Sequence, residues 1–214
     1  ADIGIAHDGD ADRCLCIDER GELIDGDHIL IMCAKLMMDA GTLAQNTVVT
    51  TVMANIGFRE AIENLGGRYE VTAVGDRYVL ENMRANGYTL GGEQSGHIIF
   101  SEFSTTGDGL ITALQVLTAM KKSGKTAAEL NAMMTTFPQV LINIRVKDKT
   151  AYKTAEEVQR AITEGETELG TAGRILVRAS GTEPLVRVMA EGPSKAQLER
   201  ICNKIAAEIE KVSG

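Results

Sequence analysis

Residues 8–13 read Asp8-Gly9-Asp10-Ala11-Asp12-Arg13, and the rest of the chain can be interpreted outward from this hexapeptide. Apolar segments lie on both sides of it, at residues 3–6 and 14–17, and both are predicted to be short buried strands. The hexapeptide is therefore a loop between two strands. In an extended chain alternate side chains share a face, so we expect the three carboxylates to point into one pocket.

Three neighbouring carboxylates repel one another unless a cation neutralises them, and their oxygens are the ligands that hard cations prefer. We therefore predict that Asp8, Asp10 and Asp12 bind Mg²⁺. Magnesium usually keeps coordination positions open for a substrate phosphate, and the planar guanidinium of Arg13 fits the same phosphate. Metal-assisted phosphate chemistry is the leading interpretation of the loop.

Two other interpretations of this loop stay open. Its spacing, with Glu19 at the twelfth position, resembles a calcium-binding loop, but Arg13 stands where that motif requires glycine. Strands are also expected on both sides, where a calcium loop has helices. The simpler alternative is a solvated acidic turn, because Asp and Gly are common in turns.

The composition limits the class of protein. The chain has 214 residues with 44% hydrophobic and 24% charged residues, which is typical of a globular protein with a substantial core. A net charge of −8 argues against a nucleic-acid or anionic-membrane partner, so an anionic substrate requires a local group of arginines. No membrane span or signal peptide is visible in the sequence.

The cysteines indicate the compartment. None of the four has a metal-binding spacing, so we expect small buried thiols in a reducing environment and predict a cytoplasmic protein. They are Cys14, Cys16, Cys33 and Cys202.

Beyond residue 24, helical and strand patterns alternate up to about residue 136. Helices are predicted at 27–39, 58–65, 76–85, 108–121 and 127–134, and strands at 47–52, 69–74 and 97–100. This alternation predicts an α/β domain with a mixed, largely parallel sheet and flanking helices. The helical pattern stops before Phe137-Pro138, where the residue preceding proline disfavours helix, and we place a domain boundary there.

The remaining chain predicts a smaller α+β domain. Strands are predicted at 140–146, 174–178 and 185–190, and helices at 154–163 and 194–212. The chain begins abruptly with an apolar strand and without an initiator Met, so we expect residues 1–24 to be the remnant of a preceding α/β domain. Without their sheet partners these residues could lie as a loose arm. The predicted domains are therefore residues 1–24, 25–136 and 137–214.

A second motif is Gly91-Gly92-Glu93-Gln94-Ser95-Gly96-His97. Its glycines allow a close approach of the backbone to a ligand. Glu93 and Ser95 alternate, so both side chains can bind neighbouring hydroxyls of a sugar, and His97 is a candidate proton shuttle. A glycine-rich turn before a strand is the simpler explanation when the motif is taken alone.

A third motif, Arg178-Ala179-Ser180-Gly181-Thr182-Glu183-Pro184-Leu185-Val186-Arg187, is expected to form a loop between strands. Backbone amides in such a loop can bind an anion, and the two arginines add charge and planar donors. A phosphate site and an ordinary loop explain the isolated motif equally well.

Together, and in this order, the three motifs resemble those of the α-D-phosphohexomutase family. The similarity extends to residues 74–78 and 105–109, and the middle motif is most similar to members that act on glucosamine phosphates. The family has four domains around a central cleft, each supplying one loop. The resemblance implies that Asp8, Asp10 and Asp12 bind Mg²⁺, that Arg13 lies beside the reacting phosphate and that His97 acts as an acid or base. It implies that Glu93 and Ser95 contact sugar hydroxyls and that Arg77 makes a further contribution. It also implies a site for the second phosphate, formed by Arg178, Ser180, Gly181, Thr182 and Arg187.

The resemblance also implies a reaction. Glucosamine 6-phosphate and glucosamine 1-phosphate would be interconverted through a phosphoserine enzyme, with glucosamine 1,6-bisphosphate, or glucose 1,6-bisphosphate, as activator. The product would supply amino-sugar nucleotides for the bacterial cell wall.

The phosphoserine loop of the family, of the TASHNP type, is not in this sequence. We therefore expect a C-terminal fragment that holds the family's third and fourth domains and is inactive without the N-terminal half. A phosphomannomutase or phosphoglucomutase is an alternative, disfavoured only by Gln94. A non-catalytic sugar-phosphate-binding module is another.

Overall fold

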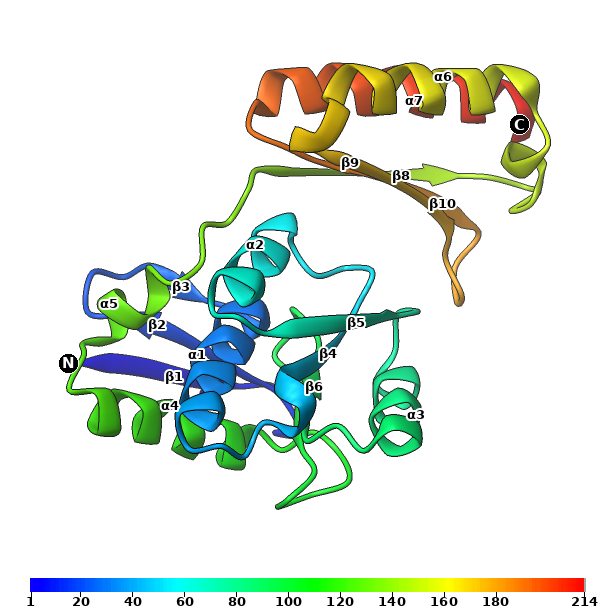
Figure 1. Cartoon of the computed structure of the whole chain (residues 1–214). Coiled ribbons are helices and arrows are strands. Elements are labelled where there is room, and N and C mark those ends of the chain that lie inside the picture. The colour runs from blue at the N-terminus through cyan, green and yellow to red at the C-terminus, as the bar shows by residue number, and fades with distance from the viewer. Residues whose placement is uncertain (214) are drawn as a thin grey trace. The chain divides into compact units, whose positions relative to one another are not determined.

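The computed structural model describes residues 1–213 and contains two compact units, Ala1–Thr136 and a second that begins at Phe137 (Figure 1). The first unit opens with a small antiparallel sheet in the order β1-β2-β3. Its strands are β1 (Ile3–His7), β2 (Cys14–Asp18) and β3 (Leu23–Ile24).

A four-stranded sheet in the order β5-β4-β6-β7 forms the centre of the first unit. Its first three strands are parallel and β7 is antiparallel, which confirms the predicted mixed, largely parallel α/β fold. The strands are β4 (Thr47–Thr51), β5 (Arg68–Thr72), β6 (Leu90–Gly92) and β7 (Ile98–Phe100). The helices are α1 (Gly26–Asp39), α2 (Ile56–Asn64), α3 (Asp76–Asn86), α4 (Gly109–Ser123) and α5 (Ala127–Asn131), and a 3₁₀ turn, η1, covers Ala44–Asn46.

Helices cover both faces of this sheet. Successive residues of a strand point to opposite faces, and Val48 packs into the core that contains α1 while Val49 packs against Val79 and Met83 of α3. Helix α1 is buried from Gly26 to Ala34, on all its sides, because it lies among α2, α4, α5 and β6.

Residues 1–24 are not a loose arm. Cys14, Cys16 and Ile24 are fully or almost fully buried in the same core as α1. The prediction of a buried strand at residues 3–6 is only half right, because β1 is an edge strand whose Ile5 is 40% exposed. The core covers one face of this small sheet, and the other face is open.

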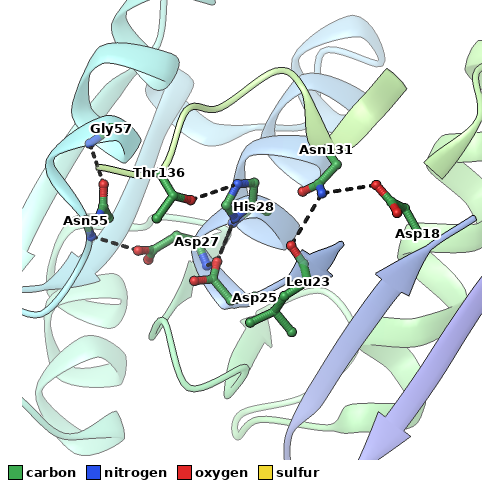
Figure 2. Close-up of polar contacts among 9 residues, drawn as sticks. All are labelled: Asp18, Leu23, Asp25, Asp27, His28, Asn55, Gly57, Asn131 and Thr136. Carbon is green, nitrogen blue, oxygen red and sulfur yellow. Dashed lines mark hydrogen bonds and ion pairs between the residues drawn. The ribbon is translucent and has the colours of Figure 1, made fainter. Parts of the chain in front are cut away.

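The hairpin between β2 and β3 is tied to helix α5. The Asn131 side-chain amide donates to Asp18 Oδ2 at 3.4 Å and to the Leu23 carbonyl at 3.3 Å (Figure 2). The Glu19 carboxylate accepts a hydrogen bond of 3.0 Å from the Ala128 amide in the first turn of α5. The bond to Ala128 gives Glu19 a structural role, and Glu19 is not among the carboxylates that converge with Asp8, Asp10 and Asp12 in the described chain.

The second unit is an antiparallel sheet in the order β8-β10-β9 with both long helices on one face (Figure 1), as predicted for an α+β domain. Its elements are β8 (Gln139–Arg145), η2 (Ala151–Lys153), α6 (Glu156–Leu169), η3 (Gly170–Ala172), β9 (Arg174–Ala179), β10 (Leu185–Glu191) and α7 (Lys195–Ser213).

Helix α6 is longer than predicted. The sequence pattern places its end at Thr163, whereas the helix continues to Leu169 through Gly165. A side chain at residue 165 would meet Ile175 Cδ1 at 2.7 Å and Ile201 Cγ2 at 2.8 Å. The glycine therefore allows α6 to pack closely, and this packing outweighs its low helix propensity.

The cysteines and the helix lengths bear on two further predictions. All four cysteines are unpaired and buried, as predicted. Within residues 1–213 no helix combines the length and the apolar character needed to cross a membrane.

Gly57 provides a test of the packing in the first unit. Its Cα faces the Thr135 carbonyl so closely that an added Cβ would overlap that oxygen. We expect Gly57→Ala to lower the free energy of unfolding by about 1–3 kcal/mol, although alanine is the better helix former. Urea unfolding followed by circular dichroism measures the change. Glu60→Ala, at an exposed site of the same helix, is the matched control, and equal stability of the two variants would contradict the steric argument.

Candidate active site

The acidic loop brings its three carboxylates together, but not in the way predicted. The loop is a turn in which the Ala11 amide donates to the Asp8 carbonyl at 3.2 Å, and Ala11 has a positive φ of 58°. One oxygen from each of Asp8, Asp10 and Asp12 lies within 4.8 Å of the others. The convergence therefore comes from the turn and not from an extended chain.

The electrostatics of this cluster suit a cation. Burial of the carboxyl group and then the charge of Asp10 raise the pKa of Asp12, while His97 and Arg13 oppose this shift. Asp12 Oδ1 is buried and has no hydrogen-bond partner within the described chain, whereas Asp8 and Asp10 are exposed. A hard cation would satisfy the buried oxygen and offset the repulsion, so these residues fit Mg²⁺.

Arg13 lies beside the cluster. Its Nε is 3.6 Å from Asp8 Oδ2, and its amide donates to Asp8 Oδ1 at 3.3 Å. The side chain is 50% exposed, so the guanidinium can still bind an anion. The Arg13 carbonyl is also 2.9 Å from His7 Nδ1, a contact that the sequence analysis missed.

His97 is brought to the same place. Its Nε2 is 3.4 Å from Asp12 Oδ2, and its ring is almost fully buried. Nδ1 is buried without a hydrogen-bond partner among the described residues. The imidazole is thus fixed at the edge of the acidic cluster, and its acid/base role stays a prediction.

The motif predicted to bind the sugar differs from the prediction in its local shape. Gly91 and Gly92 belong to β6, so only residues 93–96 form a turn. The Glu93 amide donates to the His97 carbonyl at 3.1 Å, and the Gly96 amide donates to the Glu93 carbonyl at 3.0 Å. Glu93 and Ser95 therefore do not alternate along a strand. Ser95 is exposed, and Glu93 Oε1 accepts from the Gly75 amide at 3.0 Å.

Backbone contacts hold this turn between two other elements. The Gly26 amide at the start of α1 donates to the Gln94 carbonyl, and the Cys14 amide of β2 donates to the Gly96 carbonyl, both at 3.0 Å. A Cβ at residue 26 would overlap the Glu93 carbonyl. The sequence analysis missed Gly26, for which the only signal is a small residue at the start of a helix.

Two further loops complete the surroundings. The Gly109 amide at the start of α4 donates to the Ala11 carbonyl of the acidic loop at 2.9 Å. Arg77 lies in the first turn of α3, next to the Gly75 amide that binds Glu93. Its side chain is 80% exposed, and its Nε lies 2.7 Å from Glu81 Oε1. The role predicted for Arg77 in ligand binding stays a prediction.

The second unit carries the predicted phosphate motif, and its two arginines lie on β9 and β10, within the strands predicted at 174–178 and 185–190. Arg178 of β9 and Arg187 of β10 are directly opposite each other in the sheet. Burial and then the charge of Arg187 lower the pKa of Arg178, and Arg187 Nε is buried with no hydrogen-bond partner in the described chain. Two like charges opposite each other are unfavourable without an anion between their side chains. Arg187 also pairs with Glu183 at 3.1 Å.

The intervening loop is held at its first residue. The Ser180 amide donates to the Leu185 carbonyl at 2.8 Å, and Ser180 Oγ accepts from the Glu183 amide at 3.3 Å. Gly181 and Thr182 are exposed at the tip. Lys149 Nζ donates to the Ser180 carbonyl at 3.0 Å, which adds a cation that no sequence motif indicates.

Comparison with known families defines the class. Residues 25–137 match the model of phosphoglucomutase/phosphomannomutase alpha/beta/alpha domain III, and residues 141–208 match the C-terminal domain of the same family. The chain belongs to the phosphoglucomutase/phosphomannomutase family.

Individual relatives narrow the comparison. The chain is 55% identical over 205 residues to a phosphoglucosamine mutase of Brevibacillus brevis, covering 96% of this chain and 46% of the relative. It is 51% identical over 217 residues to that of Lactococcus lactis, covering 100% and 48%. The chain thus spans about half the length of the curated relatives it matches.

Solved structures agree with this assignment. Aspergillus fumigatus N-acetylphosphoglucosamine mutase in complex with GlcNAc-6P and magnesium is similar with a TM-score of 0.82 at 28% identity, over 98% of this chain and 49% of that chain. A variant of the same enzyme in complex with glucose 1,6-bisphosphate has a TM-score of 0.81 at 26% identity, over 99% and 49%.

The acidic cluster leads to a test of cation binding on this chain. We expect Asp10→Asn to weaken Mn²⁺ binding about tenfold or more, because it removes a charged ligand. Electron paramagnetic resonance of free Mn²⁺ measures the change. Asp39→Asn, at an exposed carboxylate paired with Lys35, is the control, and an equal effect of both variants would reduce the cluster to a general acidic surface.

The arginine pair leads to a test of phosphate binding. Arg187→Gln removes one of the two opposed guanidinium groups, and we expect it to weaken binding of glucosamine 6-phosphate about 10- to 100-fold. Phosphorus NMR titration of this chain measures the affinity. The control is Arg200→Gln, which should leave the affinity unchanged. Arg200 lies on α7 and pairs with Glu168 of α6. If both variants bind alike, the pair is not the phosphate site.

Proposed function

We propose that the whole protein to which this chain belongs interconverts glucosamine 6-phosphate and glucosamine 1-phosphate. The observation that carries the proposal is the convergence of Asp8, Asp10 and Asp12 beside Arg13 and His97. The identity of 51–55% to phosphoglucosamine mutases of two bacteria supports this choice of substrate.

In this reaction the first unit serves the transferring phosphoryl group. Asp8, Asp10 and Asp12 hold Mg²⁺, which when bound offsets negative charge on that group. Arg13 donates hydrogen bonds to the same group from its exposed guanidinium. His97 Nε2, beside Asp12, exchanges a proton with the reacting sugar hydroxyl.

The turn at residues 93–96 orients the sugar. One carboxylate oxygen of Glu93 is bound to the Gly75 amide, which leaves the other oxygen to accept from a sugar hydroxyl. The Ser95 hydroxyl is exposed and binds a neighbouring hydroxyl. A few such contacts suit a mutase, because the bisphosphate intermediate must bind in two orientations.

The second unit holds the phosphate that is not reacting. Arg178 and Arg187 supply charge, and Ser180, Gly181 and Thr182 supply hydroxyl and backbone donors. A solved neighbour in complex with glucose 1,6-bisphosphate supports a sugar 1,6-bisphosphate, of glucosamine or glucose, as intermediate and activator.

The remaining half of the enzyme supplies the phosphoserine, and this chain alone is inactive. The relatives are about twice as long, and the open face of the β1-β2-β3 sheet supports a missing partner. Ile17 and Leu23 are paired on this face and are 48% and 56% exposed, and Gly4 lies against Ile17. We assign residues 1–24 to the end of the family's second domain, 25–136 to the third and 137–214 to the fourth, in a cytoplasmic protein whose buried thiols stay reduced.

The test uses the full-length enzyme. We expect isomerisation of glucosamine 6-phosphate in the presence of Mg²⁺ and bisphosphate, no turnover by this chain alone, and a loss of about 100-fold or more in kcat for Asp10→Ala. Asp39→Ala should keep full activity. Undiminished turnover of Asp10→Ala would overturn the proposed role of the cluster.

Two other outcomes decide between the remaining candidates. Phosphate binding that needs no cation, without turnover by the full-length enzyme, would indicate a binding module. A higher kcat/KM for glucose or mannose phosphates would indicate a different hexose, and Gln94 is then not a specificity signal.

A further inference from the structure

The start of helix α1 carries a compact polar cluster that the proposed chemistry does not use (Figure 2). Asp25 caps this helix, and its Oδ1 accepts from the amides of Asp27 at 3.1 Å and His28 at 3.2 Å. The same oxygen is 2.8 Å from His28 Nδ1. Both side chains are mostly buried, at 14% and 8% exposure, so the imidazole has a fixed orientation.

The other nitrogen of this imidazole contacts Thr136, the last residue of the first unit. His28 Nε2 lies 3.3 Å from the hydroxyl of Thr136. Because Nδ1 faces the Asp25 carboxylate, Nε2 is the ring nitrogen that is left to hydrogen-bond with the threonine hydroxyl. Figure 2 shows Thr136 pointing from its loop toward His28.

A second contact holds the residue before Thr136. Gly57, in the first turn of α2, lies against the Thr135 carbonyl with no room for a side chain. Asn55 caps α2 through the Gly57 amide at 3.0 Å, and Asp27 Oδ2 accepts from the Asn55 amide at 2.8 Å. Both contacts to residues 135–136 therefore lead back to the start of α1.

The chain enters the second unit directly after this anchor. The Pro138 carbonyl accepts from the Gly192 amide at 3.2 Å, and β8 begins at Gln139. Only Phe137 separates Thr136 from this bond. Thr136 is thus the last residue of the first unit.

The same helix end also supports the sugar-binding turn, because the Gly26 amide donates to the Gln94 carbonyl. We infer that His28, oriented by Asp25, is a positioning residue: it fixes Thr136, the point where the chain leaves the first unit, relative to the turn that carries Glu93 and Ser95. The inference rests on the proposed function. Its benefit is a start of α1 that is held on both sides, by Thr136 and by the turn, so that less order must be gained at the turn when a sugar binds there.

The first test needs no activity. In this chain, hydrogen exchange of the peptide covering residues 134–140 should be about 2- to 10-fold faster in Thr136→Val, which keeps the side-chain shape but removes the hydroxyl. Thr136→Ser keeps the hydroxyl and should exchange like the wild type. Thr135→Val, at the neighbouring exposed threonine, is the matched control. Equal exchange in Thr136→Val and Thr135→Val would overturn the inference.

The second test uses the full-length enzyme. We expect Thr136→Val and His28→Gln to raise KM for glucosamine 6-phosphate about 2- to 10-fold with little change in kcat, and Thr136→Ser to restore the wild-type KM. A fall in kcat with unchanged KM would overturn the inference.

The two proposals fail in different ways. A wild-type enzyme that does not isomerise glucosamine phosphates refutes the proposed function, while the exchange experiment still decides whether Thr136 is anchored. An active wild type whose KM is unaffected by Thr136→Val refutes the positioning role alone.

Discussion

The first unit depends on a close contact between backbones at the turn of residues 93–96. This turn lies between the first amide of α1 and the first amide of β2, and each donates a hydrogen bond to one of its carbonyls. A glycine at position 26 permits the approach, since any side chain would overlap the Glu93 carbonyl. The acidic loop directly precedes β2, and His97 directly follows the turn. The contact between the turn and β2 therefore brings His97 next to Asp12.

Charge is distributed in a way that a net value of −8 conceals. In the first unit three aspartates lie together, one of them with a buried oxygen that has no hydrogen-bond partner in the described chain, and a cation would neutralise them. In the second unit two arginines lie opposite each other, with Lys149 at the neighbouring loop, and an anion would neutralise them. Each arrangement is unfavourable by itself and becomes favourable when its ligand binds, which is typical of a binding site and not of a surface selected for stability.

Much of the fold follows from local pattern. The alternation of helices and strands and the buried thiols could be predicted because hydrophobic periodicity acts over a few residues. The end of α6 was not readable, because Gly165 looks unfavourable in a helix until Ile175 and Ile201 are packed against it. The exposed face of β1 and β2 was not readable either, since apolar strands look alike whether or not a partner covers them.

By itself the sequence determined the chemistry: which carboxylates, arginines, hydroxyls and imidazole are available, and the family whose motifs they form. Only the tertiary structure decided how they meet. It placed the carboxylates on a turn, Arg178 opposite Arg187 across two strands, and His97 against Asp12. The physical reason is that strand register and backbone approach join residues far apart in the chain, whereas a motif records only neighbours along it.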